Sequence, residues 1–427
     1  MRTISNTLKN NKESDYTEII YELGKNFIYD DNKDDYWSPA ELSILFGTPI
    51  YDQCSHSQRL ALNHLYWTQL YNQTAASEMN TIFFNRITAG VFNNISDYSE
   101  LCDELEFECE QEKHHIRTFQ RVAYKTNNAL LGKNYLTDTK KSNLSQAKLS
   151  KANASSQIYI YKTFNLLAQF LQRNNRKYHS NYLARLQGDG QAIASPNSGL
   201  GGNLASRNML QFFTINWGSS PFMACQYYTL RYTANSMLKS QESKVSRFFM
   251  HLKNNEKFIP APTAISRFHF LDEAFHTTIS QLLGRDLFRH FNEPTHFERY
   301  LSNLIISKLQ KNLLGGFSGA MPGRSVSDSL RLMKDIYSLF RSPIFEFTHE
   351  DCLYWIEQIF CYEHNGFHNT YKILEGFHAD LRRLFGKLDY LSTSNRELLI
   401  MRAAISIDAA INLNKDTFNE FYSSISL

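Results

Sequence analysis

Long stretches of this chain carry apolar residues at intervals of three and four positions, with few residues that would interrupt a helix. Only 9 prolines and 18 glycines occur among its 427 residues, so turn signals are sparse. Apolar residues on one face of a helix recur at this spacing, whereas a half-buried strand would show strict alternation. A chain of this length can also bury a large core. We therefore predict an all-α fold.

Two pairs of long helices are predicted. The first helix of the first pair runs from about 57 to 90. The second follows the break NNISDYSEL and ends at about 125. In that break Ser96 or Asp97 would cap the second helix, with Glu100 completing a capping box. The second pair is centred on the linker NNEKFIPAPT, which follows a helix at 222–253 and whose prolines start the next helix. Short connections make each pair an antiparallel hairpin.

The domain organisation follows from these pairs. Residues 1–56 form an N-terminal extension, residues 57–292 form a four-helix core, and residues 293–427 form a helical region packed on that core. Asn, Lys and Ser and then Gly dominate at about 126–203, which indicates a polar insertion with one helix inside it at 158–178. Three to five further helices are expected after Asn292.

Composition excludes several classes of protein. Lysine and arginine number 45 against 42 acidic residues, and the signs are interspersed, so the basic surface of a nucleic-acid-binding protein is absent. No window approaches the 18 or more apolar residues of a membrane span, and we expect a cytoplasmic protein. The 6 cysteines form no C-x-x-C pair, which argues against a thiolate zinc site.

The pattern Glu-x-x-His places a carboxylate and an imidazole one turn apart on a helix, where together they can bind a metal ion. With 23 Glu and 14 His in the chain, chance alone gives roughly 0.75 matches. The chain has five: Glu112 with His115, Glu273 with His276, Glu293 with His296, Glu346 with His349, and Glu375 with His378. Glu293 and His296 enclose a proline, and Glu346 with His349 follows Pro343 closely, so neither pair is secure within a helix.

One of the remaining pairs is accompanied by a third candidate ligand. His269 precedes Glu273 and His276 in the segment RFHFLDEAFHTTI, which gives H-x-x-x-E-x-x-H. At about 100° per residue these three side chains lie on one narrow stripe of the helix. No other Glu in the chain has this arrangement, so this segment is the strongest single indication of a metal site.

The two hairpins supply partner carboxylates. Residues equally far from the turn of a hairpin face each other, which pairs Glu78 with Glu112 across position 95 and Glu242 with Glu273 across the second linker. Facing hairpins in a four-helix bundle would bring seven candidate ligands to one interior point. These are Glu78, Glu112, His115, Glu242, His269, Glu273 and His276. Four carboxylates balance two divalent ions, and a mixed oxygen and imidazole set favours iron or manganese.

The order of these motifs over residues 60–283 resembles the p-aminobenzoate N-oxygenase (AurF-like) family of ferritin-like di-iron enzymes, in which the third histidine is a distinguishing ligand. The resemblance implies a ferritin-like bundle, two iron ions held by the seven residues above, and dioxygen as co-substrate. It also implies N-oxygenation of an aromatic amine toward a hydroxylamine or nitro product, with an external electron donor such as a ferredoxin and its reductase. The long gap between His115 and Glu242 departs from that family, so Glu242 is the least secure ligand.

Residues beyond the ligand set have open interpretations. Tyr228, Arg231 and Asn235 precede Glu242 on one helix face, where Arg231 could hold a substrate carboxylate or form a surface ion pair. Each ligand histidine should donate its second ring N–H to a carboxylate or carbonyl, for which Asp272 or Glu108 could serve. Glu108 could also be an additional ligand.

Several alternatives remain open for the function. A rival metal site would combine Glu375 and His378 with Glu357, His364 and His368, although Asn365-Gly366 should break the helix between them. A di-iron C–H hydroxylase or desaturase would use the same ligands, as would an iron-oxidising ferritin-like protein without an organic substrate. A metal-free helical scaffold is the remaining class, and the sequence is compatible with a homodimer.

Overall fold

The computed structural model describes residues 2–132, 207–311, 318–322, 330–404 and 406–425, and isolated positions between 159 and 171. Within these residues every regular element is helical and no strand occurs, which confirms the all-α prediction. The predicted polar insertion and the helix at 158–178 lie almost wholly outside the described residues. Among the helices that are described, none is both long and apolar enough to cross a membrane.

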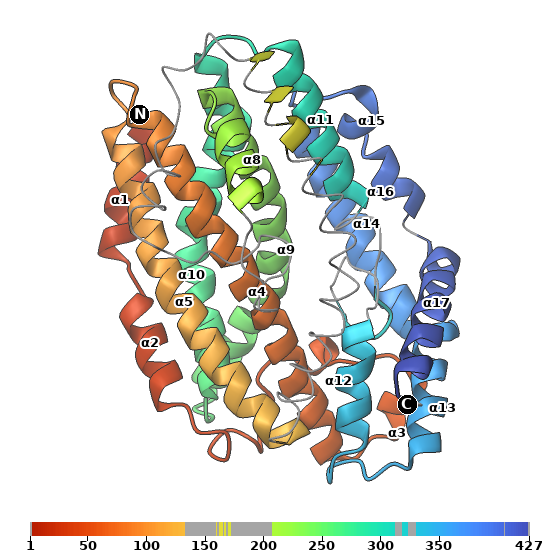
Figure 1. Cartoon of the computed structure of the whole chain (residues 1–427). Helices are drawn as coiled ribbons and strands as arrows, with labels where there is room; N and C mark the ends of the chain where they lie inside the picture. Colours follow the sequence, from red (N-terminus) through yellow and green to blue (C-terminus); the bar gives the residue numbers. More distant parts are fainter. Residues whose placement is uncertain are drawn as a thin grey trace.

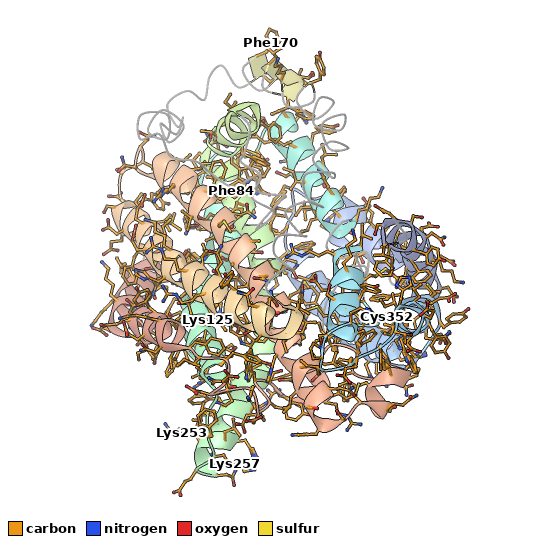
Figure 2. The ribbon with its side chains drawn as sticks, turned by 60° about the horizontal axis from the view of Figure 1, so that its bottom comes forward. Phe84, Lys125, Phe170, Lys253, Lys257 and Cys352 are labelled. Carbon is orange, nitrogen blue, oxygen red and sulfur yellow. The ribbon has the colours of Figure 1, made fainter. Side chains whose placement is uncertain are left out.

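Four long helices form the centre of the molecule: α4 (His56–Phe92), α5 (Ser99–Leu131), α9 (Pro221–Asn254) and α10 (Ala261–Gln281). Helix α4 packs along α5 and α9 packs along α10, while α4 also contacts α9 and α5 contacts α10. Figure 1 shows these helices running side by side as a bundle. The two predicted hairpins are therefore confirmed. In Figure 2, Lys253 and Lys257 mark the projecting tip of the α9–α10 hairpin.

Local capping explains where two of these four helices, α4 and α9, begin. Ser55 and Gln58 form a capping box at the start of α4, and the Ser220 hydroxyl accepts the Met223 amide just before Pro221 begins α9. The predicted cap of α5 is wrong: Asp97 has a left-handed φ of 73°, and the residue before the helix is Tyr98, which makes no side-chain cap. Helix α5 also continues to Leu131, past the predicted end, because its apolar face goes on packing against α4.

The N-terminal residues cover one side of the bundle. Helices α1 (Arg2–Glu13) and α2 (Thr17–Asn26) both contact α5 and α10, so they lie over the groove between those two helices. A Cβ on Gly24 would lie 2.5 Å from the Thr118 methyl group, so glycine permits α2 to approach α5 this closely. After the short helices η1 (Ala40–Leu42) and α3 (Pro49–Gln53), the chain enters α4.

The C-terminal region lies against the other side of the bundle, with α11 touching α9 and α12 touching α5. Helix α10 first continues through the π-helical turn η4 (Leu282–Asp286) and η5 (Leu287–His290). The helices that follow are α11 (His296–Leu309), α12 (Leu330–Phe340), α13 (His349–Cys361), α14 (Asn365–Phe385), α15 (Thr393–Arg396), α16 (Leu399–Ala404) and α17 (Ile407–Ile425). Cys352 of α13 lies within this group in Figure 2. The described residues thus contain seven helices here rather than three to five, because two of them are short.

Two apolar cores divide the bundle along its axis. One contains Ala61 to Ala75 of α4 with Ile116 to Leu130 of α5, and the other contains Phe83 to Phe92 of α4 with Leu101 and Leu105 of α5. Between them, the middle turns of all four long helices carry buried polar and charged side chains instead. The bundle therefore encloses a polar layer from which the cores on both sides exclude water.

His64 of α4 lies away from that layer. It is fully buried, its ring stacks on Trp37 at 4.0 Å between centroids, and its two nitrogens lie 3.1 Å from the Tyr29 hydroxyl and 2.9 Å from the Asp35 carbonyl. The carbonyl only accepts, so Nε2 carries the proton and Nδ1 accepts from Tyr29. Burial lowers the pKa of His64 to about 4.

We predict that His64 makes the folded chain sensitive to acid. Between pH 6.5 and pH 4 the unfolded chain protonates this histidine and the folded chain does not, so stability falls as the pH falls, by about 3 kcal/mol for this one group. His64→Gln keeps an acceptor and a donor but cannot titrate, so this loss is the difference between the unaltered chain and His64→Gln in urea unfolding at pH 7, 6, 5 and 4. Relative to His64→Gln, the unaltered chain should lose stability as the pH falls.

His56→Gln is the matched control, because His56 is exposed on the same helix. Its pH profile should follow that of the unaltered chain. Parallel profiles for the unaltered chain and His64→Gln would contradict the assignment.

Candidate metal centre

Six of the seven predicted ligands meet in the polar layer as two groups of three. Within each group, one candidate ligand atom from each residue lies within 4.8 Å of the others. The first group, here the Glu78 triad, joins α4, α5 and α10; the second, here the Glu273 triad, joins α5 and α10. The triads are Glu78, His115 and His269, and Glu112, Glu273 and His276. All six side chains are buried.

Each histidine directs one ring nitrogen toward the carboxylates of the centre. Nδ1 of His115 lies 3.4 Å from Glu112 Oε2, and Nδ1 of His276 lies 2.8 Å from Glu273 Oε1. Nε2 of His269 lies 3.0 Å from Glu78 Oε1 and 3.7 Å from Glu273 Oε1. His276 Nδ1 also lies 3.4 Å from Glu112 Oε1, which connects the two triads. This is a compact set of carboxylate oxygens and imidazole nitrogens, the donors that iron and manganese accept.

Glu242 occupies a different position from the other six. Its Oε1 lies 2.7 Å from Nδ1 of His269 and accepts a hydrogen bond from the Tyr71 hydroxyl at 2.6 Å, so it lies behind His269. The residue that reaches Glu273 from α9 is Asn235, at 2.9 Å. The residue of α9 that reaches Glu273 thus lies seven positions, about two turns, before Glu242, which the symmetric pairing required.

The three predicted substrate-binding residues lie beside the triads and contact side chains of this chain. Arg231 donates from Nη1 to Glu108 at 2.6 Å and from Nη2 to Glu112 at 3.3 Å, and it is buried. Asn235 donates to Glu273, as above, and the Tyr228 hydroxyl donates to Asn85 at 2.9 Å. No observation tests contact with a substrate, which stays a prediction for all three.

Other polar residues of the layer were missed or left open by the sequence. Glu104 is fully buried, and Asn85 donates at 2.9 Å to Glu108 Oε2, the same oxygen that accepts from Arg231. Asp272 Oδ2 lies 3.3 Å from Nε2 of His115. Of the two predicted acceptors for a ligand histidine, Asp272 and Glu108, Asp272 therefore occupies that position. Periodicity could not find Glu104, because acidic residues four apart on α5 look like an ordinary solvent-exposed face.

The rival site at Glu375 and His378 does not form in the described residues. Helix α13 ends at Cys361 and α14 begins at Asn365, which confirms the predicted break. Glu375 is exposed, and His368 pairs with Glu363 at 2.8 Å on the surface. These side chains offer no buried ligand group.

The charges of the polar layer fit two divalent ions. Among the described residues of the layer, the buried carboxylates far outnumber the one buried arginine, Arg231. These carboxylates are Glu78, Glu104, Glu108, Glu112, Glu242, Asp272 and Glu273. The second oxygens of Glu78 and Glu242 are buried without a hydrogen-bond partner. Unpaired buried carboxylates are very costly, so this arrangement calls for additional cations. Two metal ions would supply them.

Burial and the crowding of carboxylates also shift the pKa values of the residues in the centre. Burial and the neighbouring Glu112 raise the pKa of Glu78 to about 7. Burial lowers the pKa of His115 and His276, but the carboxylates beside them outweigh it and raise these pKa values to about 9 and about 10. Without metal, protons bound to these side chains therefore compensate part of the negative charge of the carboxylates.

A comparison with protein families identifies the group to which this arrangement belongs. The sequence profile described as acyl halogenase CylC-like matches residues 1–422. The chain belongs to the CylC-like acyl halogenase family. This family is of the non-haem di-iron oxygenase and halogenase type, so the di-iron class is shown, whereas the N-oxygenase family of the sequence analysis is not confirmed. No curated protein and no solved structure matches the chain.

We predict that the CylC-like chain without metal becomes less stable as the pH rises. Raised pKa values of Glu78, His115 and His276 stabilise the fold at low pH. For Glu78 this stabilisation is lost between about pH 4.5 and 7, and for the two histidines it is lost between about pH 6.5 and 9 or 10. Thermal unfolding after chelation, at steps from pH 6 to pH 9, should show a falling Tm.

Manganese-loaded protein is the control. Bound ions replace the protons, so its Tm should be higher and should depend less on pH over the same range. Parallel pH profiles with and without metal would contradict a metal centre at these residues.

Proposed function

We propose that this chain is a dioxygen-dependent enzyme with two iron ions that halogenates a carbon atom of an acyl substrate. The observation that carries the proposal is the pair of adjacent buried triads in a chain of the acyl halogenase family. Glu78, His115 and His269 would hold one ion, and Glu112, Glu273 and His276 would hold the other. When bound, the ions would supply the redox chemistry by which dioxygen is activated.

The other residues of the centre would hold the ligands in place. Arg231 compensates the charge of Glu108 and donates to Glu112, while Asn235 donates to Glu273. Glu242 accepts from His269 Nδ1, which leaves Nε2 free to face the ions. The apolar cores on both sides would keep water from the reacting centre.

The substrates and the electron source complete the proposal. A halide ion, dioxygen and an acyl compound would be consumed, and an external electron donor of the ferredoxin and reductase type would return the ions to the ferrous state. We place the reaction in the cytoplasm. These assignments rest on the family and on the class of metal centre rather than on a described binding pocket.

N-oxygenation of an arylamine is the second candidate function. The observation that favours it is His269, whose Nε2 faces Glu78 and Glu273 as a third histidine of the centre. C–H hydroxylation or desaturation would use the same ligands, and iron oxidation without an organic substrate would use them as well.

One assay separates these functions. Iron-loaded protein would be supplied with dioxygen, a chemical reductant, chloride or bromide, and either fatty acids and their thioesters or a panel of arylamines. Mass spectrometry should detect a product with the halogen isotope pattern from the acyl substrates. An oxygenated acyl product that lacks halogen would indicate hydroxylation, and a hydroxylamine or nitro product would indicate N-oxygenation; either would overturn the proposal.

Ligand variants show whether the reaction occurs at the triads. His276→Ala should lower turnover by more than the roughly 10–100-fold typical of residues that only support metal ligands. His378→Ala is the matched control, because it removes the histidine of another Glu-x-x-His pair that lies outside the centre. Equal turnover in both variants would exclude the triads as the site.

A further inference from the structure

The corner between α1 and α2 lies directly outside the two triads. Residues 11–16 of this corner contact α5 and α10 on the side of those helices that faces away from α4 and α9. The sequence predicts only an N-terminal extension for these residues. Their hydrogen bonds instead lead to the outward nitrogens of His115 and His276.

The contact with His276 runs through Gln111, the residue before Glu112. Gln111 Oε1 accepts from Nε2 of His276 at 3.1 Å, and Gln111 Nε2 donates to Asn11 Oδ1 at 3.1 Å and to Asp15 Oδ1 at 3.2 Å. Asn11 Nδ2 in turn donates to Gln111 Oε1 at 3.2 Å and to Glu104 Oε1 at 3.0 Å. Asn11, Gln111 and Glu104 are buried, whereas Asp15 is exposed.

These contacts define the direction of the Gln111 amide. Asp15 and Glu104 as carboxylates can only accept, so the NH2 groups of Gln111 and Asn11 must face them. Gln111 Oε1 then faces His276 and requires a proton on Nε2. A neutral histidine protonated on Nε2 has its lone pair on Nδ1, the nitrogen that lies 2.8 Å from Glu273 in the centre.

The contact with His115 runs through Asp272. Nε2 of His115 donates to Asp272 Oδ2 at 3.3 Å, and the backbone N–H of Tyr16 donates to Asp272 Oδ1 at 3.2 Å. The Tyr16 ring also stacks on Phe268 of α10, with 5.4 Å between centroids. The corner thus holds the carboxylate that orients this second histidine, again leaving Nδ1 toward the centre.

We propose that the α1–α2 corner is a positioning element of the metal centre, which sets the tautomers of His115 and His276 and thereby the affinity for metal. Asn11 acts on His276 through Gln111, and the Tyr16 amide acts on His115 through Asp272. This inference rests on the metal centre of the proposed function. It assigns to the first helices a role in metal binding beyond packing.

Metal binding by the full chain, without dioxygen or substrate, tests the proposal. Asn11→Leu keeps the number and branching of the side-chain heavy atoms but removes both hydrogen-bonding groups, so the Gln111 amide loses one of its two acceptors and the Asn11 donor to its oxygen. Isothermal titration with Mn²⁺ should show that one of two ions binds about 10–100-fold more weakly, while the ion of the Glu78 triad keeps its affinity. Asp272→Asn should weaken the other ion instead.

Asn32→Leu is the matched control. Asn32 is also buried in the N-terminal region, but it bonds the Ile28 carbonyl and the Ala261 amide and touches neither histidine. It should lower the Tm and leave both manganese affinities unchanged. The comparison therefore separates positioning of ligands from loss of packing.

The outcomes distinguish this proposal from the proposed function. If the unaltered chain binds no metal, both are overturned. If it binds two ions and Asn11→Leu keeps both affinities, only the role of the corner is overturned. Should Asn11→Leu fail to fold, the exposed Asp15→Ala substitutes for it: a several-fold weaker affinity for one ion supports the proposal, and two unchanged affinities overturn it.

Discussion

The structure depends on the burial of many carboxylates in a layer that holds one arginine. Burial of a carboxylate without a counter-charge costs a large amount of folding free energy, so the layer requires further cations. The histidines supply them when protonated, and two divalent ions would supply them without protons. Every other feature of the centre, from the Arg231 pair to the outward partners of the histidines, compensates or orients these charges.

The bundle keeps this polar layer apart from the apolar side chains that pack its two ends. Apolar side chains fill the bundle on both sides of the layer, so that the polar middle turns of α4, α5, α9 and α10 do not weaken the ends. Helices α1 and α2 close the groove between α5 and α10, because both contact both of those helices. The covering helices therefore carry hydrogen-bonding groups as well as apolar ones.

Much of the centre was predictable from the symmetric pairing of residues about the turn of a hairpin, although only one of the two hairpins followed that pairing. The α4–α5 connection spans only a few residues, and Glu78 does lie beside Glu112 and His115 as the symmetric pairing required. The same argument misplaced Glu242, because the α9–α10 connection passes through extended residues before Pro260 and shifts one helix along the other. His269 was found from its own helix alone, since residues four and seven apart share a face without reference to any partner.

Spacing along one helix was enough to predict the helical class, the four long helices and the stripe that holds His269, Glu273 and His276. Spacing could not predict that Asn11, Asp15 and Tyr16 reach the outward side of the histidines, that Glu242 lies behind His269, or that Glu104 is buried. Hydrogen bonds between helices distant in the chain depend on packing register and burial. A sequence pattern records neither of these for a single polar residue.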